Sequence, residues 1–195
     1  MSLEKFLDEM AREFERSDWS AASRTVEALR GASFPSARDD SAPALSHGEN
    51  AVEPPTALEA LLAEESNDRT SSVASILAVY SDLTWFRSSR SQTAYSQVLG
   101  PGAILPHNEI RCGLFFLSPG SDYQNHVHGA DEVYIVVAGS GEWSLQCGPY
   151  QRKRAGDIIE VPSMTVHALR ARDSAMLTLW SWTGDITLDR YRFTD

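Results

Sequence analysis

Apolar positions along the chain follow two different periods, and the change between them falls near residue 93. Before it, Leu3, Phe6, Leu7, Met10 and Phe14 recur at the spacing of an amphipathic helix, and residues 21–29, 57–64 and 72–80 show further helical patterns. After it, short apolar runs are separated by Gly, Pro, Asn or Asp, which is typical of antiparallel strands. These runs cover residues 94–99, 110–117, 133–138, 143–147, 157–161, 166–170 and 176–182.

This pattern predicts an N-terminal helical segment at residues 1–92 and a small β-barrel at residues 93–195. The helical segment is interrupted at residues 33–55, where four prolines and several serines indicate a long loop. A segment divided in this way forms a poor core by itself, so we expect its helices to pack on the barrel. The expected fold class is therefore mainly β.

Two histidines and a glutamate near the middle of the chain have the spacing of a metal site. His126 and His128 are one residue apart, so they share a face of an extended chain. A turn at residues 129–131 brings Glu132 back against them, and His167 follows a proline turn further on. Three imidazoles and a carboxylate suit a divalent transition metal: Zn or Fe(II) foremost, with Mn, Ni and Co also compatible. His126 either binds the metal directly or lies next to its ligands.

Four aromatic residues are candidates for the surroundings of this metal. Tyr134 shares the face of Glu132, and Tyr123 lies three residues before His126. Trp180 and Trp182 have the same parity on a late strand, so both can point into the barrel. The alternative for each of them is ordinary packing in the barrel core.

Two motifs in this region resemble those of the cupin superfamily. The pattern G-x5-H-x-H-x3-E-x6-G runs from Gly120 to Gly139 with every fixed position present. The pattern G-x5-P-x-G-x2-H-x3-N begins at Gly156, but Met164 replaces its second glycine and Ala171 replaces its asparagine. The resemblance implies a cupin double-stranded β-helix barrel, preceded here by the helical segment.

A narrower resemblance is to the cupin-type dimethylsulfoniopropionate (DMSP) lyases of marine bacteria. These enzymes are metal-dependent and cleave DMSP to dimethyl sulfide and acrylate by β-elimination. The resemblance implies a tyrosine base, which we assign to Tyr134, and a role for Tyr123 in holding or polarising the substrate. It implies binding of the sulfonium cation by Tyr123, Trp182 and Trp180. The residues that carry it are Tyr123, His126, His128, Glu132, Tyr134, His167 and Trp182.

Two other functions fit the same motifs. An Fe(II)-dependent cupin dioxygenase uses similar ligands, needs no tyrosine base and requires O2. A non-catalytic metal-binding regulatory or sensor cupin places helices before its barrel to bind a partner. Phenols beside the metal favour the lyase over both.

Composition and sequence pattern limit the classes of partner and the cellular location that we expect. A net charge of −10 argues against nucleic acid and anionic membranes as partners, and no apolar run approaches the roughly 20 residues of a membrane helix. The N-terminus lacks the pattern of a signal peptide, so we expect a cytoplasmic protein, monomeric or homodimeric, whose substrate is a small sulfonium carboxylate. Cys112 and Cys147 are expected to be buried thiols, and His47 and His107 to face solvent or support the structure.

Overall fold

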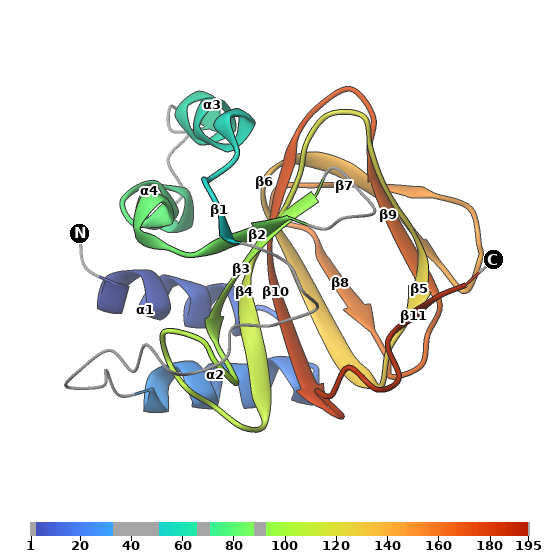
Figure 1. Ribbon diagram of the computed structural model, residues 1–195, viewed down its shortest axis with the longest axis horizontal. Helices are drawn as coiled ribbons and strands as arrows, with labels where there is room; N and C mark the ends of the chain where they lie inside the picture. The colour runs from blue at the N-terminus through green and yellow to red at the C-terminus, as the bar shows by residue number, and fades with distance from the viewer. Residues whose placement is uncertain (1–2, 33–50, 66–70, 88–92, 195) are drawn as a thin grey trace.

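The computed structural model describes residues 3–32, 51–65, 71–87 and 93–194. Its helices lie on one side of a strongly curved antiparallel sheet that closes into a barrel on the other side (Figure 1). The helices are α1 (Leu3–Phe14), α2 (Ser20–Gly31), α3 (Thr56–Glu65), α4 (Ser71–Leu77) and a short 3-10 helix (Tyr80–Asp82). The strands are β1 (Ala51–Val52), β2 (Trp85–Arg87), β3 (Thr93–Leu99), β4 (Ile110–Leu117), β5 (Ser121–Val127), β6 (Ala130–Leu145), β7 (Gln151–Arg154), β8 (Ile158–Val161), β9 (His167–Ala171), β10 (Met176–Gly184) and β11 (Arg192–Phe193).

The barrel is one continuous sheet in which β6 joins two halves. The strand order is β1-β2-β3-β4-β10-β6-β9-β5-β11, and β7 and β8 pair with β6 outside this path. The first part of β6 pairs with β10 and β8, whereas its last residues pair with β7 and β9. Because one strand belongs to both halves, residues at the start of β6 can contact side chains of β5 and β9 in the other half.

The bend in β6 is located at Gly139. The register between β6 and β10 shifts just before it, and Gly139 has a φ of 70°, a conformation that favours glycine. A Cβ atom at this position would lie 2.0 Å from the carbonyl oxygen of Ala175. Glycine is therefore required both by the backbone conformation and by the close approach of the neighbouring chain.

Two apolar clusters lie on opposite faces of this sheet. On β10, Leu177 and Leu179 face the helices and pack with the apolar face of α1, including Phe6 and Phe14. Trp180 and Trp182, of opposite parity, point into the barrel. The helices thus share a core with the outer face of the sheet, while the barrel interior is left for the second cluster.

Polar contacts also join the helices to the barrel. The Arg24 guanidinium of α2 donates to Thr183 Oγ1 over 2.6 Å, and the Ser17 hydroxyl donates to the Glu160 carboxylate over 2.6 Å. No helix in the described ranges is both long and apolar enough to cross a membrane.

The structure departs from the sequence-based expectations at several places. The run at residues 133–138 and residues 143–145 of the next run belong to one long strand, because pairing continues on both sides of Gly139. Strands β1 and β2 precede residue 93, where the sequence pattern predicts only helices and a loop. Cys112 is buried as expected, but Cys147 is exposed in the turn after β6. Residues 33–50, which hold most of the expected loop and His47, lie outside the described residues.

A substitution at the bend tests its role. We expect Gly139→Ala to lower the free energy of unfolding by more than Gly120→Ala. Both glycines have positive φ, which costs an L-residue about 1–2 kcal/mol, but only Gly139 also meets a backbone oxygen, since no atom lies within 4 Å of a Cβ at Gly120. Urea denaturation of both variants measures the difference. Equal destabilisation would contradict the close contact at Gly139.

Candidate functional site

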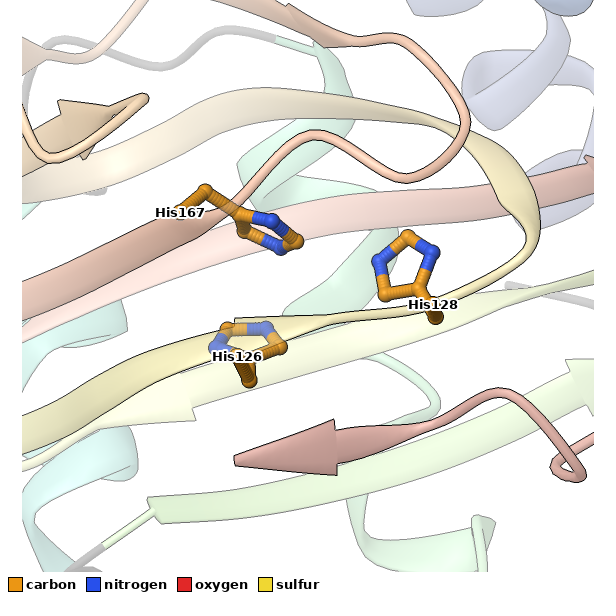
Figure 2. A group of neighbouring side chains, drawn as sticks. All are labelled: His126, His128 and His167. Atoms are coloured by element: carbon orange, nitrogen blue, oxygen red, sulfur yellow. The ribbon is translucent and has the colours of Figure 1, made fainter. Parts of the chain in front are cut away.

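Three histidines meet where β5 and β9 pair. His126 and His167 face each other across the two strands, and His128 follows directly after β5. Their ring centroids are 4.0 Å apart for His126 and His167, and 5.0 Å apart for His128 and His167. Figure 2 shows the three rings turned toward one common space. One ligand atom from each lies within 4.8 Å of the others, and all three side chains are buried.

Backbone carbonyl groups fix the orientation of each ring. The Nδ1 atoms of His126, His128 and His167 lie 2.8, 3.1 and 2.9 Å from the carbonyl oxygens of residues 124, 130 and 165. A carbonyl oxygen can only accept, so each Nδ1 carries the proton and donates it. In the neutral rings, the Nε2 lone pairs are therefore available to a metal.

Glu132 lies against two of these histidines. It occupies the start of β6 and is buried, and its Oε2 atom lies 2.9 Å from His128 Nε2 and 3.2 Å from His167 Nε2. Burial alone raises the pKa of this carboxyl, but the charge and hydrogen bond of His128, together with His167, outweigh burial and hold the pKa well below its usual range. Glu132 is thus a carboxylate at neutral pH.

These donors fit a metal cation. Nε2 lone pairs that point at a carboxylate oxygen repel it unless a proton or a cation lies between them. Burial, and next the charge of His167, lower the pKa of His126 well below its ordinary value, so this ring stays neutral. His167 Nε2 is buried and has no hydrogen-bond partner among the described residues, although it lies 3.2 Å from Glu132 Oε2. A divalent cation would satisfy all of these groups at once, and the buried triad has the geometry to hold one.

Tyr134 lies in the barrel interior beside Glu132. It is buried, and its ring packs against Phe115 and Trp143. Burial first, and the negative charge of Glu132 second, raise the pKa of Tyr134 well above its ordinary value. Any change that neutralises Glu132 therefore makes this phenol easier to ionise.

The other predicted aromatic residues differ in their surroundings. The Tyr123 ring lies 4.5 Å from the His126 ring, and the Trp182 ring lies 4.3 Å from the His128 ring. The Trp182 indole nitrogen is buried and has no hydrogen-bond partner among the described residues. Trp180, in contrast, donates its indole N–H to the Leu114 carbonyl over 3.2 Å, so it is held within the barrel wall. Of the two tryptophans, Trp182 is the one that the structure brings next to the histidines.

A third phenol at this site, that of Tyr191, comes from a segment for which the sequence pattern predicts no strand. The Tyr191 hydroxyl lies 2.5 Å from the Tyr123 hydroxyl, and its ring lies 5.8 Å from the His126 ring. Phe193, on β11, pairs with His126 on β5. The alternation of aromatic residues at positions 191 and 193 is a weak strand signal that could have indicated this segment.

His107 lies apart from the site. Its Nδ1 atom accepts hydrogen bonds from the backbone N–H groups of Glu109 and Ile110, over 3.2 and 3.1 Å, so it stabilises the turn before β4.

Comparison with solved structures identifies the fold. A chain from the crystal structures of the DMSP lyases RdDddP and RnDddQII superposes with a TM-score of 0.66 at 19% identity, covering 98% of this chain and 97% of that one. The crystal structure of DMSP lyase DddQ from Ruegeria pomeroyi DSS-3 gives a TM-score of 0.62 at 21% identity, covering 97% and 96%. The expected mainly β architecture with N-terminal helices is confirmed.

Comparison of sequences identifies the family. The curated dimethylsulfoniopropionate lyase DddQ of Ruegeria pomeroyi is 29% identical over 89 residues, which are 46% of this chain and 44% of that protein. The match thus spans less than half the length of this curated relative. The sequence profile of the dimethylsulfoniopropionate lyase family matches residues 36–178, well over half of the chain. The expected resemblance is confirmed, and the chain belongs to the dimethylsulfoniopropionate lyase family.

Proposed function

We propose that this protein is a metal-dependent lyase that cleaves DMSP to dimethyl sulfide and acrylate, with Tyr134 as the base. Family membership and the likeness to DMSP lyases support the reaction. One observation carries the assignment of the base: Tyr134 is buried beside Glu132 on β6, and Glu132 in turn contacts His128 and His167. The proposed ligands are His126, His128, His167 and Glu132, and the proposed metal is Zn or Fe(II).

The elimination needs a base and a way to stabilise negative charge. The proton to be removed is on the carbon next to a carboxylate and is therefore very weakly acidic. When bound, a divalent metal supplies a Lewis acid for the substrate carboxylate and a positive charge beside Glu132. Tyr134, as phenolate, accepts the proton on its hydroxyl oxygen. The electron pair of the C–H bond forms the C=C bond of acrylate, and the pair of the C–S bond leaves with neutral dimethyl sulfide.

The aromatic residues near the histidines suit the other end of the substrate. A sulfonium cation is attracted to aromatic faces, by roughly 0.5–2 kcal/mol for each ring. Trp182 and Tyr123, whose rings lie close to His128 and His126, are the proposed contacts. The Trp180 ring packs edge-to-face against the Trp182 ring, with 6.0 Å between their centroids, and we assign it a supporting role in holding Trp182 in place.

The first prediction concerns metal and oxygen. The purified protein, loaded with Zn or Fe(II) and given DMSP without O2, should release dimethyl sulfide and acrylate in equal amounts, and a chelator should abolish the release. Headspace gas chromatography and liquid chromatography measure the two products. Release that requires O2 would point to a dioxygenase. No release with any of Zn, Fe(II), Mn, Ni and Co would reject the lyase and leave the metal-binding regulatory protein.

The second prediction concerns the ligands. His128→Ala and His167→Ala should each lower the bound metal by at least about tenfold at limiting metal concentration, because each removes one inward-facing Nε2. Metal content after dialysis, by mass spectrometry, measures the effect. His107→Asn is the matched control, since an amide oxygen can replace its Nδ1 as acceptor, and it should leave metal content unchanged. Full metal content in both active-site variants would reject these ligands.

The third prediction concerns the base. Tyr134→Phe should lower kcat by about a hundredfold or more while metal content stays near the wild-type level, because the ring still fills its place but no phenolate forms. In the wild type, kcat/KM should rise from neutral toward alkaline pH, since burial and Glu132 raise the pKa of Tyr134 and the base is the ionised form. Tyr150→Phe is the control. Full turnover in Tyr134→Phe would reject the assignment.

A further inference from the structure

The C-terminal segment after β10 returns along the strand that carries His126. β10 ends at Gly184, and residues 185–191 lead to β11, which pairs with β5 so that Phe193 lies opposite His126. In Figure 1 this red end of the chain runs beside β5. In Figure 2 the short β11 arrow passes next to His126. The segment is thus part of the wall around the histidines.

Both ends of the segment are held in place. At its start, the Arg111 guanidinium donates to the Ile186 carbonyl over 3.0 Å, and Asp185 Oδ1 accepts from the Thr187 hydroxyl over 2.7 Å. At its end, the Thr194 backbone N–H donates to the Asn125 carbonyl over 2.8 Å. Tyr191 lies between these anchors, so the fold determines its position.

Tyr191 joins two residues already assigned to the substrate. Its hydroxyl lies 2.5 Å from the Tyr123 hydroxyl, and one of the two donates to the other. Its ring lies 6.3 Å from the Trp182 ring with 34° between their planes, and 5.8 Å from the His126 ring. Tyr191 is only half-buried, whereas Trp182 is buried, so the three rings extend from the histidines toward the surface.

The chemistry of this group of rings points to a cation. Aromatic faces carry negative electrostatic potential, and a ring that lies between two other aromatic residues, as Tyr191 does, can attract a methylated cation that has lost its water. The positive side chains of the segment do not occupy this place, because Arg190 lies 3.6 Å from the Asp185 carboxylate and Arg192 is exposed. The buried indole N–H of Trp182, which lacks a partner among the described residues, is a further donor available to a ligand.

We propose that Tyr191 is a substrate-binding residue whose ring, with those of Trp182 and Tyr123, receives the sulfonium cation. Its hydroxyl also positions Tyr123. This inference rests on the proposed function, because DMSP supplies the cation. The C-terminal segment is then a part of the substrate site, and the two roles of Tyr191 belong to different atoms of one side chain.

Two ligands of equal shape, of which only one carries the positive charge, separate the contribution of charge to binding from that of size. The trimethylammonium analogue of DMSP carries the cation, and its tert-butyl isostere has the same shape and carboxylate without the positive charge. Calorimetric titration of the metal-loaded, full-length protein gives Kd for both, and the ratio of the two Kd values measures cation preference. We expect Tyr191→Leu to reduce this preference by about two- to thirtyfold, the range for one aromatic face. Tyr191→Met, of similar size and also without an aromatic face, repeats the test if the leucine variant folds poorly.

Tyr191→Phe separates the two roles. It keeps the aromatic face, so cation preference should stay within twofold of the wild type. It removes the hydrogen bond to Tyr123, so kcat with DMSP should fall by about two- to tenfold with little change in KM. Tyr150→Leu, on the outer face of the barrel beside Arg170, is the matched control and should change neither quantity. Thermal denaturation and metal content, measured for every variant, detect a merely structural effect.

The outcomes distinguish this inference from the proposed function. If the wild type releases dimethyl sulfide but both Tyr191→Leu and Tyr191→Met keep full cation preference, Tyr191 does not bind the cation and the lyase assignment stands. A wild type without any cation preference would also overturn the inference. If the wild type prefers the cation, Tyr191→Leu loses that preference and no dimethyl sulfide appears, the cation site is supported and only the reaction is rejected.

Discussion

Three hydrogen bonds from histidine Nδ1 atoms to backbone carbonyl groups determine what the centre of this protein can do. Each carbonyl belongs to a residue two positions away from its histidine, so the ring orientation follows from the local backbone at the ends of β5 and β9. The bonds select one tautomer and turn the Nε2 lone pairs inward. The fold therefore orients the three proposed metal ligands by itself, which lowers the entropic cost of binding a metal there.

Glu132 links the three histidines electrostatically to the proposed base, Tyr134. Its carboxylate lies against His128 and His167, and its negative charge contributes to the high pKa of the Tyr134 phenol. A positive charge among the histidines reduces this effect. In the proposed mechanism, metal binding and activation of the base are therefore the same electrostatic event, and a metal-free protein keeps its phenol protonated.

The sequence predicts the proposed metal ligands more readily than the strands and aromatic residues that surround them. His126, His128 and Glu132 could be grouped from spacing alone, because strand periodicity and one short turn place them within a few residues of each other. The sequence pattern predicts two strands where the structure has β6 alone, since the pattern does not show that pairing continues on both sides of Gly139. Tyr191 could not be assigned, because its position depends on the long-range pairing of β11 with β5, and its two-residue strand has almost no periodicity.

The pairing of β11 with β5 connects two tasks that would otherwise be separate. β5 carries His126 and Tyr123, so the strand that supplies a proposed metal ligand also supplies a proposed contact for the substrate cation. β11 completes the edge of this strand and fixes Tyr191 against Tyr123. The C-terminal segment thus pairs with the strand that carries His126 and keeps the Tyr191 ring 5.8 Å from the His126 ring. In the proposed mechanism, β5 therefore determines the spacing between the metal, which binds the substrate carboxylate, and Tyr123, which contacts the substrate cation.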